Sequence, residues 1–212
     1  GTLPEFPAGK PLFIFASHFH ADHYAPVIFQ LGEKRENVFY ILSKEIGKKI
    51  PEEYRKRYKD RIRLVKAGER FCLNISEESL IVETFHSADE GVAFWLSCEG
   101  KEIYHAGDLN NWWWEGEDMA WNRNMAASYK QEMKKLSGRT ADLVFIPVDP
   151  RQEQWFYLGA AGFMEQADIK WIFPMHFWED YTIIPKLIEH PSSEGWRDRI
   201  VEIHKEGEEF IR

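Results

Sequence analysis

The sequence predicts a mixed α/β fold in which helices lie outside packed β-sheets. Short apolar, β-branched or aromatic runs recur along the chain, and their lengths suit strands better than helices. Between them lie stretches whose apolar residues follow helical spacing. The strands in the middle of the chain follow one another directly, whereas strands and helices alternate on both sides. This pattern indicates an α/β or α+β sandwich.

Taken in chain order, the expected strands are apolar runs that are too short for helices. They occupy residues 12–16, 38–42, 62–65, 71–75, 80–85, 92–97, 102–105, 143–148, 171–175 and 200–204. The expected helices occupy residues 24–31, 43–50, 51–58, 118–136, 159–167 and 183–189. Ser43 is a residue type that caps helices, and Pro51 suits a helix start because proline lacks an N–H group that the first turn leaves unpaired.

The length and net charge limit the number of domains and the kinds of partner that we expect. The 212 residues are expected to form one domain, residues 1–212, because folded domains commonly contain ~100–200 residues. The formal net charge of −8 argues against broad binding to nucleic acid or to anionic membranes. It favours a small-molecule substrate.

Cysteine content and hydropathy indicate the compartment. Only Cys72 and Cys98 are present, so neither a disulfide framework nor a cysteine-rich zinc module is expected. No apolar stretch approaches the ~20 residues of a membrane span, and no secretory signal precedes the first expected strand. We therefore expect a cytoplasmic protein without a membrane partner.

The densest group of metal-ligand side chains follows directly after the first expected strand. His18, His20, Asp22 and His23 fall within six residues, and one short loop can point several lone pairs at a common centre. Imidazole nitrogens and carboxylate oxygens suit borderline and hard divalent ions. The loop predicts half of a metal site, with Zn²⁺ as the first expectation and Mn²⁺ or iron as alternatives. An exposed histidine cluster that binds metal adventitiously is the competing interpretation.

Three later strands end near residues of the same chemical types, which are His86, Asp108 and His176. Rigid strand ends can aim such side chains into a shared cleft, so we expect the four ends to converge. His105 falls outside this pattern, and a supporting position beside the ligands is expected for it. Asp149 lies in a turn between prolines, where both orientation of a ligand and simple turn chemistry remain open.

Together these motifs resemble the metallo-β-lactamase superfamily. The order typical of that superfamily is present in the His-x-His-x-Asp-His loop at 18–23, the isolated His86, the Gly107-Asp108 pair and the terminal His176. The resemblance covers nearly the whole chain and implies a four-layer αββα sandwich of the metallo-β-lactamase type. Residues 104–110, 147–150 and 174–176 further resemble a bacterial branch of uncharacterised hydrolases related to sugar-phosphate lactonases.

The resemblance implies a site for two divalent metal ions. It assigns one ion to His18, His20 and His86, assigns the other to Asp22, His23 and His176, and places Asp108 between them as a bridge. Two ions ~3.5–4 Å apart share a hydroxide at neutral pH, because they lower the pKa of bound water. Asp108 and Asp22 are the expected catalytic residues, Asp22 through proton transfer to the leaving group.

One departure from the family pattern concerns the N-terminus. Only seventeen residues precede His18, which leaves room for little more than one strand, although members of the superfamily normally begin with strands and hairpins. We therefore expect the fold to lack N-terminal strands. An oligomeric partner or an N-terminal segment would then cover the exposed sheet edge.

A run of tryptophans follows Asp108 closely. Trp112, Trp113 and Trp114 are costly to expose unless they pack or bind something. A packed lid over the cleft and a stacking platform for a sugar, a base or an aromatic group are the two interpretations. Trp121, Trp155 and Trp178 are expected to supplement such a platform.

These features predict a dinuclear metal-dependent hydrolase, in which a metal-bridging hydroxide attacks an ester, lactone, amide or phosphodiester of a small substrate. A phosphodiesterase or nuclease of the same fold is an alternative, weakly favoured by the basic residues at 54–59 and opposed by the acidic composition. A non-catalytic, metal-stabilised ligand-binding protein is another. The ligand types are also compatible with an iron-dependent oxidative role.

Overall fold

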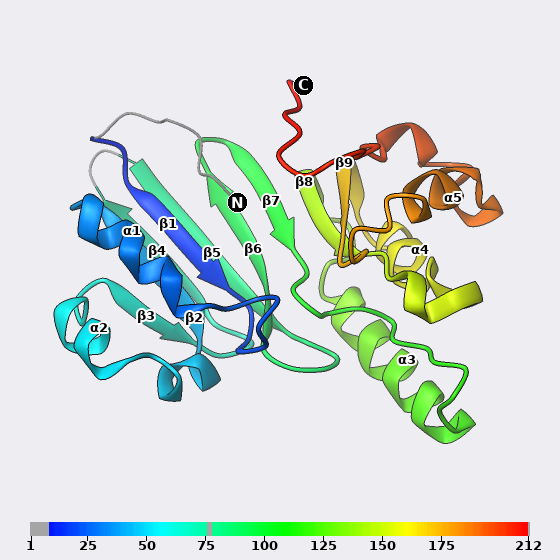
Figure 1. The fold of residues 1–212 in the computed structure, drawn as a ribbon. Helices are drawn as coiled ribbons and strands as arrows, with labels where there is room; N and C mark the ends of the chain where they lie inside the picture. Colours follow the sequence, from blue (N-terminus) through cyan, green and yellow to red (C-terminus); the bar gives the residue numbers. More distant parts are fainter. Residues whose placement is uncertain (1–8, 76–77, 212) are drawn as a thin grey trace.

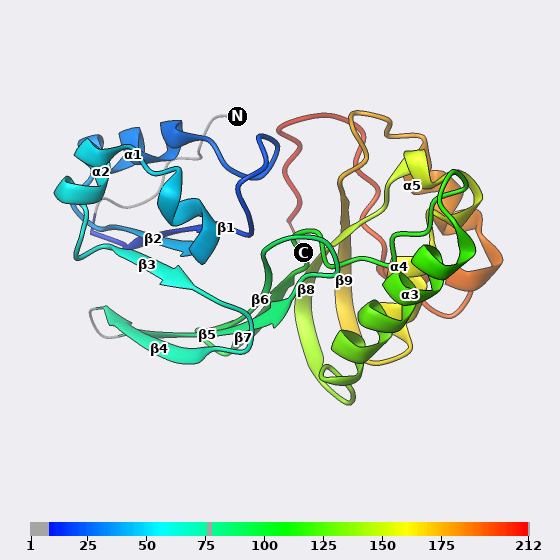
Figure 2. The same ribbon diagram turned by 90° about the horizontal axis from the view of Figure 1, so that it is seen from below.

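The computed structural model describes residues 9–75 and 78–211. Its first sheet contains three parallel strands, β1 (Leu12–Ala16), β2 (Val38–Ser43) and β3 (Ile62–Val65), in that spatial order. Parallel neighbours need crossover connections. Here the crossovers carry the short helices α1 (Phe29–Lys34) and α2 (Glu52–Arg57), which cover the same face of the sheet (Figure 2).

The second sheet contains six strands in sequence order. They are β4 (Arg70–Ile75), β5 (Glu78–His86), β6 (Val92–Cys98), β7 (Lys101–His105), β8 (Thr140–Pro147) and β9 (Asp168–Met175). Pairing is antiparallel from β4 to β7 and parallel from β7 to β9. The parallel part has the crossover helices that it requires. These are α3 (Met119–Lys134) and α4 (Leu158–Met164), with α5 (Ile183–Glu189) packed beside them (Figure 1).

Apolar side chains fill the three spaces between the four layers. Ile41 of β2 is buried with Val82 and Phe94 of the second sheet, and this cluster joins the two sheets. Phe29 and its neighbours fill the space under α1 and α2. The largest cluster lies between the second sheet and helices α3 to α5, with Tyr129 of α3 among its members. The expected four-layer αββα sandwich is therefore confirmed (Figure 2).

Strand prediction was wrong in one place. Residues 200–204 form no strand, and only an isolated bridge joins Ile200 to Ile172 of β9. The N–H group of Val201 donates to the carbonyl of Ile172 (2.8 Å). Ile200 and Val201 are buried, so their apolar character reflects packing on the edge of β9 and not an extended ladder.

Two helix starts also differ from expectation. The segment expected to be helical from residue 43 is a 3-10 helix at Lys44–Lys48, and the Ser43 side chain makes no capping hydrogen bond. The segment expected from residue 24 begins as a 3-10 turn at Pro26, where the fixed φ of proline suits the first position. Asp118 is a true cap, because its carboxylate accepts from the N–H group of Trp121 at the start of α3 (2.8 Å). Among the described residues, no helix is long and apolar enough to cross a bilayer.

The carboxyl ends of β1, β7 and β9 and the β5–β6 loop meet between the two halves of the molecule (Figure 1). The ends of β1, β7 and β9 are each followed by residues that the sequence singled out as possible metal ligands, whereas His86 is itself the last residue of β5. The topology thus brings distant parts of the chain to one place.

Candidate metal centre

The loop after β1 folds so that its histidine rings face inward. The carbonyl of His20 accepts from the N–H groups of His23 and Tyr24 (2.9 and 2.8 Å), which closes a turn. The Ser17 hydroxyl lies 3.0 Å from Nδ1 of His18 and 3.2 Å from Nδ1 of His23. These contacts fix both rings and leave their Nε2 atoms directed at Asp108. Ser17 is therefore a supporting residue that sequence reasoning missed, although it directly precedes the histidine motif.

The predicted ligands gather in two groups. One contains His18, His20 and Asp108, and the other contains Asp22, His23 and His176; the ligand atoms within each group lie within 4.8 Å of one another. Each group has two imidazoles and one carboxylate, a donor set that suits Zn²⁺ and non-haem iron alike. The sequence thus identified six side chains that the fold does bring together.

Asp108 lies between the two groups. Its Oδ2 atom is 3.3 Å from Nε2 of His18, and its Oδ1 atom is 3.0 Å from Nε2 of His23 and 3.6 Å from Nε2 of His176. Asp108 is only 5% exposed. Its Oδ1 atom and Nε2 of His23 are both buried without a hydrogen bond of good geometry. Buried lone pairs left without partners are what a metal-ligand cluster presents, so the residues fit divalent cations.

Asp149 combines the two roles that the sequence left open. Its carboxylate accepts from the backbone N–H group of Arg151 (2.8 Å), which is turn chemistry, and it also contacts a candidate ligand. Its Oδ2 atom lies 2.9 Å from Nδ1 of His176, and its carboxylate also accepts from Nε of Arg151 (3.0 Å) and from Nε1 of Trp178 (3.3 Å). The side chain is fully buried. Burial alone would raise the pKa of Asp149, but the hydrogen bonds from His176 and Arg151 hold it well below its ordinary value. The resulting carboxylate leaves Nε2 of His176 free for the cluster.

Burial sets the charge of the inner histidines. It lowers the pKa of His18 to about 4. At pH 7 the ring is therefore neutral, which is the form that offers a lone pair to a metal. Burial also lowers the pKa of His105 to about 4, and Nδ1 of that ring accepts from the N–H group of Gly107 (3.1 Å). His105 thus supports the turn that carries Asp108 and does not join either group.

His86 does not lie where the resemblance placed it. Its side chain is exposed and belongs to neither group of candidate ligands among the described residues. The reason is strand length: β5 continues through His86, which pairs with Val92 of β6, so the residue is part of the ladder and not of the loop. Its N–H group donates to Oε2 of Glu132 on α3 (3.2 Å).

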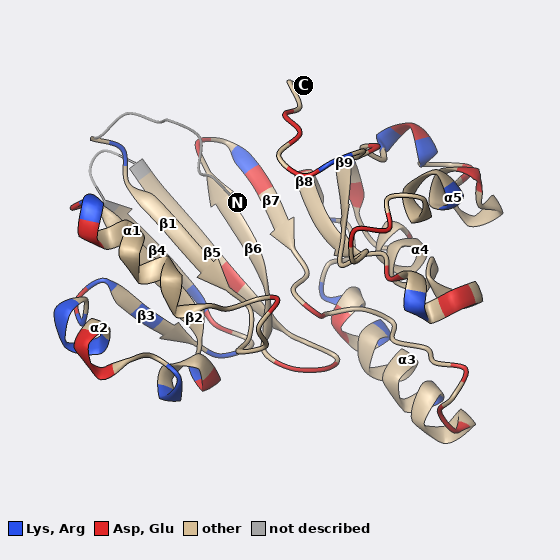
Figure 3. Ribbon diagram, viewed as in Figure 1, with Lys and Arg blue, Asp and Glu red and all other residues tan. Residues whose placement is uncertain are grey.

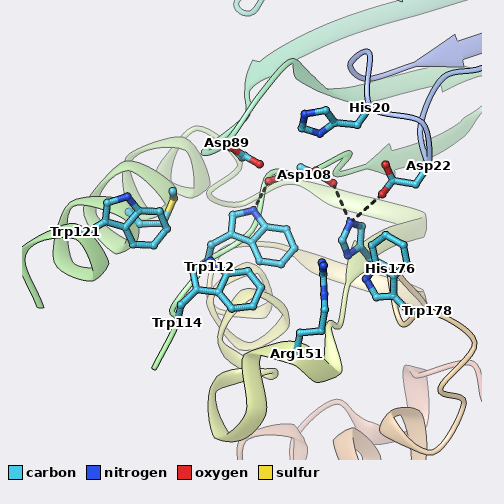
Figure 4. A pocket seen from close by; sticks show the side chains of 11 residues that line it. His20, Asp22, Asp89, Asp108, Trp112, Trp114, Trp121, Arg151, His176 and Trp178 are labelled. Atoms are coloured by element: carbon cyan, nitrogen blue, oxygen red, sulfur yellow. Dashed lines mark hydrogen bonds and ion pairs between the residues drawn. The ribbon is translucent and has the colours of Figure 1, made fainter. Parts of the chain in front are cut away.

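A cavity of about 290 Å³ opens beside the two groups (Figure 4). Its lining combines candidate ligands with aromatic side chains and one guanidinium: His20, Asp22, Asp89, Asp108, Trp112, Trp114, Trp121, Met125, Arg151, His176 and Trp178. Asp89, Met125 and Arg151 are lining residues that sequence reasoning did not assign to the site, whereas Trp121 was expected to supplement the tryptophan run. Arg151 stands two residues after Asp149, and that proximity was the available signal for it.

The tryptophans divide into packed and open ones. Trp112 is buried, and its Nε1 atom donates to the backbone carbonyl of Asp108 (2.9 Å). Its ring stacks on Trp114 with 5.6 Å between centroids and 4° between planes. Trp178 is 52% exposed at the other side of the cavity and contacts His176 edge-on. Trp113 and Trp155 pack against each other, and neither lines the cavity.

The guanidinium of Arg151 lies between the aromatic walls. Its Cζ atom is 4.6 Å from the ring centre of Trp178 and 5.8 Å from that of Trp114. Cation–π contacts of this kind hold the three side chains together as one wall. Trp112 packs against His176, whereas Trp114 and Trp178 present ring surface to the cavity.

Comparison with known proteins finds similarity in structure only. No protein-family model and no curated protein matches the sequence. CmlA, a diiron β-hydroxylase from Streptomyces venezuelae, is similar in structure with a TM-score of 0.53 and 13% identity, over 91% of this chain and 43% of that chain. This chain thus spans less than half the length of CmlA.

Two further solved structures are similar at lower TM-scores. The metallo-β-lactamase fold protein YhfI from Bacillus subtilis has a TM-score of 0.41 and 11% identity, over 81% of this chain and 67% of that chain. The short form of human tRNase Z has a TM-score of 0.45 and 15% identity, over 82% and 74%. At such identities the likeness concerns the fold alone. With its αββα layers and its candidate ligands at strand ends between the sheets, this chain has the metallo-β-lactamase fold.

Proposed function

We propose that this protein is a metal-dependent hydrolase whose centre holds two divalent ions. His18, His20 and Asp108 would hold one, and Asp22, His23 and His176 the other. The observation that carries the proposal is the position of Asp108, whose two oxygens face imidazoles of both groups at 3.0 to 3.6 Å. When bound, such ions supply a nucleophile from water at neutral pH and stabilise negative charge in the transition state.

The protein's own residues have distinct tasks in this proposal. Asp108 sets the spacing of the two groups, and Asp149 fixes the ring of His176 through Nδ1. Asp22 lines the cavity, is 34% exposed and lies 3.5 Å from Nε2 of His176. A carboxylate at the boundary between cavity and solvent is suited to pass a proton to a leaving group.

The aromatic wall supports a small substrate with a flat group. The exposed surface of Trp178 faces the cavity from one side, and the stacked pair Trp112 and Trp114 faces it from the other (Figure 4). The cavity volume of about 290 Å³ suits one ring and a short chain rather than a polymer. A sugar face, a base or an aromatic ring would stack there, with the scissile bond beside Asp108.

The central test is replacement of the shared carboxylate. Asp108→Ala should lower the metal content of purified protein and abolish hydrolysis in a screen of lactones, thioesters, phosphodiesters and β-lactams. Asp60→Ala is the matched control, because Asp60 is an exposed carboxylate in the turn before β3. Elemental analysis and the activity screen are done on the same samples. Normal metal content with full activity in Asp108→Ala would refute the proposal.

A second test concerns the aromatic side chains that line the cavity. Trp178→Ala should raise KM for the best substrate about tenfold or more while kcat changes little, because stacking contributes on the order of 1–3 kcal/mol. Trp113→Ala is the matched control, since Trp113 packs against Trp155 and lines no part of the cavity. Equal KM values for both variants would show that the wall does not bind the substrate.

An iron-dependent oxidative function is the second candidate. Each ligand group consists of two histidines and one carboxylate, which is also the set that binds non-haem iron with open positions. Elemental analysis of protein purified in air, together with oxygen uptake measured with iron and reductant, separates the two functions. Zinc content with hydrolysis and no oxygen uptake supports the hydrolase.

The nuclease alternative has less support from the structure. The basic residues expected to meet phosphates lie on α2, in the outer helical layer and away from α3 to α5 (Figure 3). Within α2, Lys56 pairs with Glu52 one turn earlier (2.6 Å). A solvated helix face explains these charges without a polyanion. RNA binding that weakens steeply with salt would restore the nuclease interpretation.

A further inference from the structure

The loop between β5 and β6 presents a carboxylate, not an imidazole, to the cavity beside the first ligand group. Asp89 lines the cavity together with His20 and Asp108 (Figure 4). We infer that Asp89, and not His86, is the fourth protein ligand of the ion held by His18, His20 and Asp108. This inference rests on the proposed function, because it assumes that the group binds a metal ion.

Contacts of Gly91 hold this loop against the histidine loop. Its φ is +78°, and a Cβ atom at this position would lie 2.0 Å from the carbonyl oxygen of Ser17 and 2.6 Å from Cβ of His18. The next residue, Val92, donates its N–H group to the same Ser17 carbonyl (3.0 Å). Only glycine permits so close an approach in this conformation. The two loops are therefore in direct backbone contact.

Hydrogen bonds within the loop turn Asp89 toward the cavity. The N–H group of Ser87 donates to the carbonyl of Gly91 (3.3 Å), and the N–H group of Asp89 donates to the Ser87 hydroxyl (3.3 Å). Ser87 itself is fully buried. The loop thus forms a closed turn whose tip carries the Asp89 side chain, and Figure 4 shows this carboxylate on the same side of the cavity as Asp108 and His20.

The first group has room for this additional ligand. It has three members, His18, His20 and Asp108, whereas Zn²⁺ usually has four ligands. His86 cannot take the position without breaking the β5–β6 ladder at its pair with Val92. Asp89 also lies outside both groups, but it is already outside the ladder and lines the cavity beside His20 and Asp108. An oxygen ligand in place of an imidazole also favours Mn²⁺ or iron over softer ions.

Metal analysis of paired variants tests the inference. Purified wild-type protein, Asp89→Ala, His86→Ala and the neighbouring control Glu90→Ala are dialysed against Zn²⁺ or Mn²⁺, and bound metal is counted per chain. We expect two ions in wild type, His86→Ala and Glu90→Ala. Asp89→Ala should keep one ion and bind the other at least about 100-fold more weakly, since even indirect ligand contacts contribute 10–100-fold.

Circular dichroism verifies that each variant is folded, and Asp89→Asn replaces Asp89→Ala if the alanine variant unfolds. Two tightly bound ions in the folded Asp89 variant would overturn the inference, and so would loss of an ion in His86→Ala. A wild-type protein without bound metal would instead refute the proposed function as a whole. The two failures are therefore distinguishable.

Discussion

Asp149 shows how one buried residue can organise a whole side of the site. It contacts a candidate ligand, His176, and two side chains of the cavity wall, Arg151 and Trp178. The carboxylate is fully buried, yet its hydrogen bonds satisfy it. The orientation of His176 and the positions of Arg151 and Trp178 therefore depend on one residue, Asp149, which does not itself line the cavity.

Asp149→Asn should weaken metal binding at the second group about 10–100-fold, a magnitude typical of residues that orient a metal-binding histidine. The amide keeps the shape of the side chain but lacks the negative charge. Its NH₂ group cannot accept a hydrogen bond, so a donor of His176 or Arg151 loses its acceptor. Titration against a chelator of known affinity measures the loss. Asp168→Asn is the control, because Asp168 is an exposed partner of Arg199. Unchanged affinity in Asp149→Asn would contradict the orienting role.

His105 predicts a pH dependence of stability in the metal-free protein. Its pKa is about 4 in the folded chain, because burial disfavours the charged ring, and about 6.5 when unfolded. The unfolded state therefore binds more protons between these values, and stability falls as pH decreases from 6.5 toward 4. The full shift corresponds to about 3 kcal/mol at most.

Urea unfolding of wild type and His105→Gln across pH 4.5 to 7.5 measures this effect. We expect the free energy of unfolding to fall less steeply with acid in the variant, because glutamine does not titrate. Parallel curves for the two proteins would show that His105 makes no contribution to the pH dependence.

At the scale of elements, strand ends and one glycine position the site. The first ligand after each of the strands β1, β7 and β9 lies within three residues of the last strand residue, and the 18–23 loop then supplies three more. Rigid strands restrict where such side chains can lie. The β5–β6 loop is held by a different device, the close approach of Gly91 to Ser17.

Gly91→Ala should destabilise the protein by at least about 2 kcal/mol, through a left-handed φ and a direct clash with the Ser17 carbonyl. Gly100→Ala separates these causes, because Gly100 has a similar φ of +71° but nothing within 4 Å of its Cβ position. Urea unfolding gives both values. If Gly91→Ala lowers the free energy of unfolding no more than Gly100→Ala does, the close approach of Gly91 to Ser17 is not required for stability.

At the scale of the whole molecule, the site joins the two sheets. The ligands of the 18–23 loop follow the first sheet, whereas Asp108 and His176 follow strands of the second. An ion bound by residues from both sheets binds the folded state and not the unfolded chain. Metal binding should therefore stabilise the sandwich.

Free Zn²⁺ at about 100 times its Kd should add about 2.7 kcal/mol to the free energy of unfolding for each ion bound. Unfolding of chelator-treated protein with and without added metal measures the gain. Asp108→Ala should show little of it. An equal gain in wild type and Asp108→Ala would place the stabilising metal elsewhere on the chain.

Much of the fold and the site follows from local patterns in the sequence. In the described part of the chain, the nine strands of the two sheets lie within the expected apolar runs or extend them by a few residues, since alternation and length are properties of each segment alone. Six of the seven predicted ligands gather because they follow strands, and the sheet topology brings strand ends together. Residue type and position in the chain carry this information.

The tertiary structure decided which neighbours of those strand ends face inward. Pairing with β6 extends β5 through His86, so this side chain stays in the sheet. Because successive strand residues point to opposite faces, the residue at which β5 ends determines which side chains of the following loop reach the cavity. Asp89 faces the cavity instead. Likewise Trp113 packs against Trp155, while Met125 and Arg151 reach the cavity from other segments. Such choices depend on contacts between segments far apart in sequence, and no local pattern encodes them.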